Sequence, residues 1–160
     1  IHPEKIADDL APIMETLAKY KVPILIPTAW TQFPGALYYG DPVWVDELAG
    51  KHPDVPIILT KMGRSISHLF ENALSVAMRN ENVFFDTVGT RPDHLKRAVK
   101  AIGSHRIMFG SDWSATWRWL SQPYDIYTVR KKVLLDADLS SSDYEQIFWK
   151  TAAKVFKLPL

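Results

Sequence analysis

The sequence predicts an α/β fold in which four strand–helix units build a parallel sheet. Two observations predict it. Each strand segment is a short, continuous apolar run, as in a parallel sheet that helices cover on both faces. These runs recur about 25 to 35 residues apart, with helical patterns between them, as right-handed βαβ crossovers require.

The first unit begins with a helix, expected over residues 3–20 from its apolar residues at helical spacing. Pro12 should kink or break this helix, because proline has no N–H to donate and its ring crowds the preceding turn. The first strand is expected at residues 22–26. Pro23 is tolerated there because it lies near the start of the strand, where a ladder donor can be spared.

The other elements follow the same alternation. A long loop is expected at residues 27–40, and Asp41 then provides the N-cap of a helix that runs to Lys51. Near the C-terminus, Ser142 and Glu145 have the spacing of a capping box. The remaining strands are expected at 57–59, 83–85 and 107–109, and the remaining helices at 66–80, 92–102, 125–134 and 142–156.

Composition excludes several classes of function. The 160 residues carry a formal net charge of +1, which offers no field to hold nucleic acid or an acidic membrane surface. The densest basic run, Arg130 to Lys132, is expected on a solvated helix face. The absence of cysteine excludes disulfides, thiolate metal sites and cysteine nucleophiles. No apolar run approaches the roughly 18 residues of a membrane span. The absence of cysteine is typical of a cytoplasmic protein, which we expect here.

The number of units predicts half of a barrel. A complete (β/α)8 TIM barrel takes about 250 residues, and four such strands cannot close on themselves without leaving apolar edges open to aggregation. We therefore expect residues 1–160 to form a C-terminal half barrel of four βα units and a closing helix. It would pair with an N-terminal half absent from this sequence, or with a partner chain in a homo-oligomer. An open doubly wound sheet is the alternative.

The most specific motif closes the fourth unit. Residues 101–113 read AIGSHRIMFGSDW, which resembles the GxxRIxFGSDW segment of the amidohydrolase-related family of TIM-barrel metal-dependent hydrolases and decarboxylases. The resemblance extends over nearly the whole chain. Residues 22–26, 56–63 and 82–87 resemble the family's fifth, sixth and seventh strands, and residues 143–158 resemble its C-terminal helix.

The resemblance implies a metal site that this sequence only partly matches. In that family, histidines of the first, fifth and sixth strands and an aspartate of the eighth hold a divalent metal, most often zinc. Asp112 matches the aspartate, and a carboxylate at a strand end can bind a metal or act as a general base. Pro27 and Lys61 stand where the two later histidines belong. Proline cannot ligate, and a protonated lysine must first lose its proton.

Lys61 therefore has three interpretations. It can replace a lost ligand and form an ion pair with Asp112 in an inactive site. It can supply the positive charge of the metal and polarise a carbonyl group or form a Schiff base. It can also make no contact with Asp112.

None of the histidines has the spacing of a metal site. His68 follows the loop of the expected sixth strand and lies on the presumed catalytic side, although a helix-capping or surface role also explains it. His94 is expected on the surface of its helix. The others fall at a chain end or on the opposite side of the barrel: His2, His52 and His105.

Aromatic and basic residues after the strands are candidates for substrate binding. Trp113 and Trp30 could form aromatic walls of a pocket, although an oligomer interface or a lid would show the same residues. Arg64 and Arg118 could hold a substrate carboxylate through two parallel hydrogen bonds, and structural ion pairs explain them equally well.

These features predict an enzyme of this family that acts on a small-molecule substrate. The leading hypothesis is hydrolysis of a C–O or C–N bond in a small organic acid, lactone or amide, with Asp112 as the catalytic carboxylate and Lys61 beside it. The alternatives are non-oxidative decarboxylation and an inactive barrel relative that binds a ligand or partner.

Overall fold

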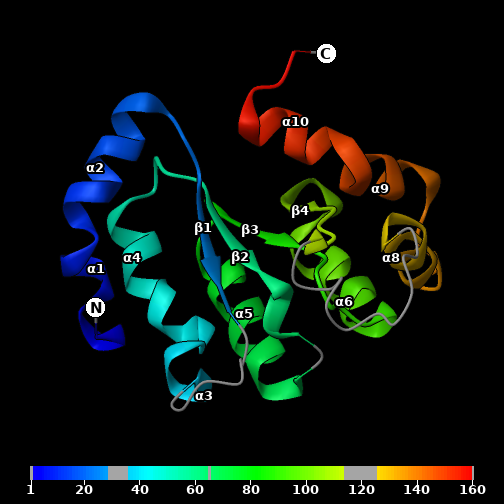
Figure 1. Cartoon of the computed structure of the whole chain (residues 1–160), viewed down its shortest axis with the longest axis horizontal. Coiled ribbons are helices and arrows are strands. Elements are labelled where there is room, and N and C mark those ends of the chain that lie inside the picture. The colour runs from blue at the N-terminus through cyan, green and yellow to red at the C-terminus, as the bar shows by residue number, and fades with distance from the viewer. Residues whose placement is uncertain (1, 29–35, 65, 114–125, 160) are drawn as a thin grey trace.

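The centre of the molecule is a four-stranded parallel sheet with the strand order β1-β2-β3-β4. A computed structural model describes residues 2–28, 36–64, 66–113 and 126–159 of the chain. Each strand pairs in parallel with the next one along the sequence, without the reversal of an open doubly wound sheet. This order confirms the predicted succession of βα units (Figure 1). The strands are β1 (Ile24–Pro27), β2 (Ile57–Thr60), β3 (Val83–Asp86) and β4 (Ile107–Met108).

Helices precede, connect and follow the strands as predicted, with one addition. The expected loop before Asp41 contains a short helix, α3 (Ala36–Tyr39). The first helix breaks at Leu10, immediately before the turn that contains Pro12. The other helices and turns are η1 (Pro3–Lys5), α1 (Ile6–Asp9), α2 (Ala11–Tyr20), η2 (Pro42–Trp44), α4 (Val45–Lys51), η3 (Lys61–Gly63), α5 (Ser67–Arg79), α6 (Pro92–Ile102), η4 (Ser104–Arg106), α8 (Ile126–Leu135), α9 (Ser141–Glu145), the π-helical segment η5 (Gln146–Lys150) and α10 (Thr151–Phe156).

Side-chain caps fix two helix starts. Asp41 accepts a hydrogen bond from the backbone N–H of Val43, as predicted. The predicted capping box at Ser142 is wrong, because Ser140 is the cap and accepts from the N–H of Asp143 at 3.1 Å. Spacing alone could not decide between the serines of this run.

Alternate residues of the strands pack on opposite sides of the sheet. Ile57 and Leu59 belong to the main core, which includes buried residues of α4, α5 and α6. Ile58, between them, packs with Met108 and Val155 in a second, smaller cluster. Because α10 supplies Val155, this helix lies against the second side of the sheet. Strands β2, β3 and β4 therefore pack on both sides of the sheet, which explains their continuous apolar sequence.

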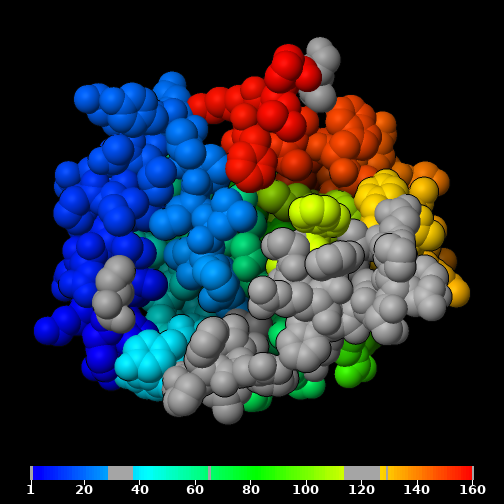
Figure 2. Space-filling model, viewed as in Figure 1, coloured from blue at the N-terminus to red at the C-terminus, as the bar shows by residue number. Residues whose placement is uncertain are grey.

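The end of the chain lies close to the segment that joins α2 to β1. Lys157 of the C-terminal segment donates from Nζ to the backbone carbonyl of Lys21 at 3.2 Å. Figure 2 shows the corresponding segments, red and blue, side by side on one face. Not all of this region is covered, since Leu25 of the first strand remains 54% exposed. None of the helices in the described ranges is long and apolar enough to cross a membrane.

Candidate active site

Three ionisable side chains meet where the parallel strands end. Asp86 is the last residue of β3, Lys61 directly follows β2, and Asp112 lies four residues beyond β4. Parallel strands bring their carboxyl ends to the same edge of a sheet, so residues far apart in the sequence become neighbours there.

Lys61 and Asp112 form an ion pair at this edge. Lys61 Nζ lies 3.3 Å from Asp112 Oδ2, and the two side chains are 20% and 30% exposed. Both residues have positive φ angles, 74° and 54°. This conformation is costly for residues other than glycine and is concentrated at functional sites. The contact rules out the interpretation in which Lys61 does not touch Asp112.

Asp86 holds the backbone of Lys61 in place. Its Oδ1 accepts hydrogen bonds from the N–H of Lys61 at 2.7 Å and from the N–H of Val88 at 3.0 Å. Burial raises the pKa of Asp86 to about 6, and the two N–H donors oppose that rise. Asp86 was not among the residues predicted for the site. The available signal was the same as for Asp112, namely an acidic residue directly after an apolar strand.

Gly110 lets the ends of β3 and β4 approach closely. A Cβ atom at this position would lie 2.9 Å from Cγ2 of Val88 and 3.1 Å from Oδ2 of Asp86, tighter than ordinary contacts. The N–H of Gly110 also donates to Oγ1 of Thr87 at 3.1 Å. The glycine of the FGSDW motif is therefore required by the space that the side chains of Val88 and Asp86 occupy.

Two arginines extend the site away from the sheet. Arg64 follows the turn after β2, and its Cγ would lie 3.0 Å from a Cβ added at Gly89. Arg130 comes from α8. Burial lowers the pKa of the Arg130 guanidinium, the negative charge of Asp112 raises it, and the positive charge of Arg64 lowers it, so both groups lie near it. The expectation that Arg130 lies on a solvated helix face is wrong, although Lys131 and Lys132 are exposed.

Trp113 is the one further predicted site residue that falls within the described ranges. Trp113 follows Asp112 directly and is 71% exposed, so the described residues do not enclose it. Trp30 and Arg118 lie outside the described residues, and the predictions for them stay open.

The histidines contribute nothing to the site. His68 lies in the first turn of α5 and is exposed, consistent with a surface role. The expectation that His94 lies on a helix surface is wrong. It is 3% exposed and stacks on Phe70 with the ring centroids 4.0 Å apart. The helical pattern did put His94 on the inner face of α6, four residues before the buried Ala98.

The residues of this edge do not fit a divalent metal. Among the described residues, no group of three or more histidine, aspartate or glutamate side chains is placed to hold one. Pro27, at the end of β1, offers no side-chain donor atom. Asp86 already accepts two backbone N–H groups, and the Lys61 ammonium contacts Asp112, where it would compete with a cation.

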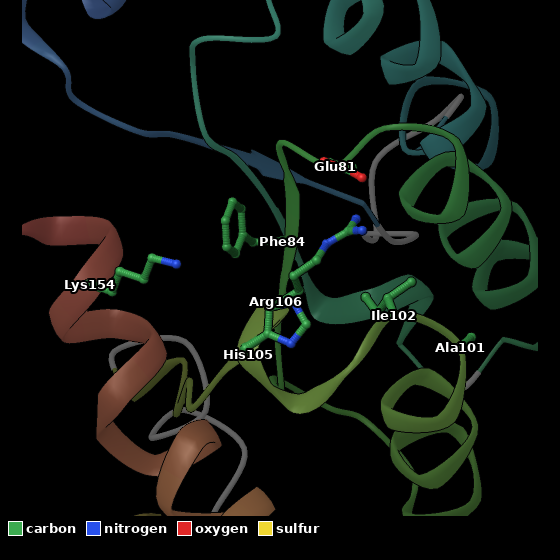
Figure 3. Close-up of a pocket in the computed structure, with 7 residues that line it drawn as sticks. All are labelled: Glu81, Phe84, Ala101, Ile102, His105, Arg106 and Lys154. Carbon is green, nitrogen blue, oxygen red and sulfur yellow. The ribbon is translucent and has the colours of Figure 1, made fainter.

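A separate pocket lies at the opposite end of the sheet. Its volume is about 410 Å³, and its lining residues include His105 and Arg106, which precede β4 (Figure 3). The guanidinium of Arg106 donates to the backbone carbonyls of Val83 and Asn80 at 2.7 to 3.0 Å. Arg106 therefore joins the starts of two strands, and this pocket is not part of the strand-end site.

A sheet in sequential strand order, with its ionisable residues at the carboxyl ends of the strands, defines the barrel class of α/β proteins. Within this class, the amidohydrolase family matches the chain over residues 3–158. The chain belongs to the amidohydrolase family. No curated protein matches it.

Solved structures with the same fold are distant in sequence. The 2,6-dihydroxybenzoate decarboxylase of Rhizobium is 19% identical with a TM-score of 0.67, and the match covers 92% of this chain and 55% of that chain. A zinc-bound amidohydrolase of Burkholderia multivorans is 18% identical with a TM-score of 0.69, covering 98% of this chain and 60% of that chain. A TIM-barrel protein of Bordetella bronchiseptica is 16% identical with a TM-score of 0.71, and the match covers 98% of this chain and 52% of that chain. The chain thus spans little more than half the length of these proteins.

Proposed function

We propose that the intact protein hydrolyses a C–O or C–N bond of a small organic acid, lactone or amide. The observation that supports this proposal is the contact between Lys61 and Asp112, 3.3 Å apart at the strand ends of an amidohydrolase-family fold. A carboxylate beside an ammonium group combines a proton acceptor with a donor that can stabilise negative charge.

The proposed reaction uses these two side chains in different roles. Asp112 accepts a proton from water while the water oxygen bonds to the carbonyl carbon of the substrate. Lys61 Nζ donates a hydrogen bond to the carbonyl oxygen, where negative charge develops. The C–O or C–N bond then breaks, and the leaving group takes the proton that Asp112 accepted. Asp86 holds the Lys61 backbone through its N–H and thereby supports the direction of the side chain.

Decarboxylation is the second candidate, and Asp86 favours it. Burial raises the pKa of Asp86 to about 6, so part of this carboxyl group is protonated near neutral pH. Such a group could give a proton to the carbon from which carbon dioxide departs, as the carbon–carbon bond breaks. Some proteins with similar structures are named as dihydroxybenzoate decarboxylases.

Product analysis tests the two reactions against each other. We would incubate the intact protein separately with carboxylate-bearing lactones and amides and with 2,6-dihydroxybenzoate, and identify products by NMR. We expect ring-opened acids or released amines, with carbon dioxide absent. The Asp112→Asn variant should lose at least about 100-fold in rate, the usual contribution of a general base. Loss of carbon dioxide alone would support decarboxylation. No turnover of any compound would support the inactive relative.

A further inference from the structure

A second pocket lies at the amino ends of the strands, whereas Lys61 and Asp112 lie at the carboxyl ends. Its volume is about 540 Å³, which is within the range of small-molecule binding sites. It is lined by residues that precede β1 and β2 and by residues of β3, α10 and the segment after α10. This pocket is therefore separate from the candidate active site.

Three lysine side chains make the lining of this pocket positively charged. They are Lys21, Lys154 and Lys157, and the lining also contains one carboxylate, that of Asp54. Three lysines against one aspartate leave an excess of two positive charges. The lysine ion pairs of the described ranges are made by other residues, namely Lys51, Lys61, Lys96 and Lys150. Within those ranges, no salt bridge neutralises the lysines of the pocket, so the pocket favours an anionic ligand.

The lysines come from two ends of the chain that a hydrogen bond holds together. Lys157 donates from Nζ to the backbone carbonyl of Lys21 at 3.2 Å. An ammonium group has three N–H donors, so two remain for a ligand. Lys154 lies three residues before Lys157, and Figure 3 shows its side chain extending from α10 toward Phe84. Positive charges are thus held on both sides of the contact between the two segments.

The same pocket has an apolar part. Phe84 and Pro56 are partly buried there, and Val155 is buried. Phe84 and Lys154 also line the pocket of about 410 Å³ described above, so the two pockets adjoin. An aromatic ring beside ammonium groups suits a ligand that combines an apolar or flat group with a negative charge.

We propose that this pocket binds a small phosphate monoester whose organic group is apolar or aromatic. A phosphate monoester carries a charge of about −1.5 to −2 near neutral pH, which matches the excess of two positive charges. Its terminal oxygens accept hydrogen bonds from ammonium groups, which bind phosphate as point charges. The organic group packs against Phe84. Because the pocket lies away from the strand-end site, the proposal does not depend on the proposed reaction.

Binding of phenyl phosphate to the intact protein tests the proposal. We would titrate the protein with phenyl phosphate, inorganic phosphate, phenol and phenyl sulfate, and measure the dissociation constants by calorimetry. We expect phenyl phosphate to bind at least about tenfold more tightly than inorganic phosphate or phenol, because it combines the charge with the ring. Phenyl sulfate has the same shape with one negative charge and should bind at least about threefold more weakly. Equal binding of inorganic phosphate or of phenyl sulfate, or no saturable binding of phenyl phosphate, would overturn the inference.

Variants show where the ligand binds. The double variant Lys154→Met with Lys157→Met should weaken binding of phenyl phosphate at least about tenfold, and Lys154→Arg should keep most of it. Lys132→Met, exposed on α8, and Lys61→Met, at the strand-end site, should leave the affinity unchanged. An unchanged affinity in the double variant, or an equal loss in Lys61→Met, would contradict the assignment. If the double variant does not fold, Lys154→Met alone decides, with an expected loss of at least about threefold, since this side chain is exposed.

Discussion

At the scale of single residues, Asp86 connects the site to the stability of the fold. It is buried, and its carboxylate accepts the N–H groups of two loops that carry the site, those of Lys61 and Val88. Its pKa rises from 3.8 to about 6 on folding because burial disfavours the charged form. The folded protein therefore binds this proton more tightly than the unfolded chain does.

The resulting dependence on pH has a definite sign. The stabilisation from protonated Asp86 is fully present below about pH 4 and is lost as the pH rises through 6. We expect Asp86→Asn to gain stability relative to the wild type between pH 4 and pH 7.5, by up to roughly 3 kcal/mol, since one unit of pKa corresponds to about 1.4 kcal/mol. Urea unfolding at both pH values measures this gain. A difference that does not change with pH would contradict the raised pKa.

His94 should make the stability of the fold depend on pH in the opposite direction. Burial lowers its pKa, with smaller effects from Asp93, Arg91, Arg97 and Glu71. The neutral ring, stacked on Phe70, is the form that the fold accommodates, so its contribution is present above about pH 6.5 and lost as the pH falls.

We expect His94→Gln to be less stable than the wild type at pH 7.5 and to differ less from it at pH 5. The measurement is the urea midpoint of both proteins at the two pH values, with the exposed His68→Gln as the matched control. An undiminished difference at pH 5 would argue against a buried neutral histidine.

At the scale of elements, the turn after β2 positions both Lys61 and Arg64. Four consecutive residues, Lys61 to Arg64, have positive φ angles between 42° and 74°. Gly63 is the only one of the four that adopts this conformation without a steric cost. It also lies against α5, since a Cβ there would be 2.4 Å from the N atom of Phe70.

Two glycine substitutions separate turn geometry from helix propensity. Gly63→Ala should destabilise the protein by more than about 1 kcal/mol, because its Cβ would overlap backbone atoms that cannot move aside. Gly50→Ala, in α4 and with its nearest contact at 3.8 Å, should stabilise it by about 0.5 to 1 kcal/mol. Denaturant unfolding compares the two. Similar effects of both substitutions would refute the special role of the turn.

The strands could be predicted from the sequence, whereas two buried polar side chains could not. Continuous apolar runs were sufficient to locate the strands, because helices on both sides exclude polar residues from them. Lys61 and Asp112 were found through the resemblance to the family, since Asp112 matches its aspartate and Lys61 stands where it has a histidine. Arg130 was missed because a basic run is usually solvated, and its burial depends on how α8 packs beside β4. His94 was missed because its polarity outweighed the helical pattern that put it inside.

At the scale of the molecule, the exposed edge strand of the sheet is consistent with the similarity of this chain to part of longer barrel proteins. The chain covers 52% to 60% of the three solved structures described above. Leu25 of the edge strand β1 is 54% exposed. We infer that this edge and its apolar side are covered in the intact assembly, by further barrel strands or by another subunit. The closed assembly would then complete the walls around the Lys61–Asp112 pair.

The central claim is that the Lys61–Asp112 pair performs the reaction, and turnover by one variant tests it most directly. Lys61→Met removes the ammonium group while keeping a flexible side chain of similar length. We expect the intact Lys61→Met protein to hydrolyse its best substrate at least about 100-fold more slowly than the wild type, with Lys131→Met unchanged, because Lys61 stabilises the charge that develops in the transition state. Turnover by Lys61→Met at the wild-type rate would contradict the claim.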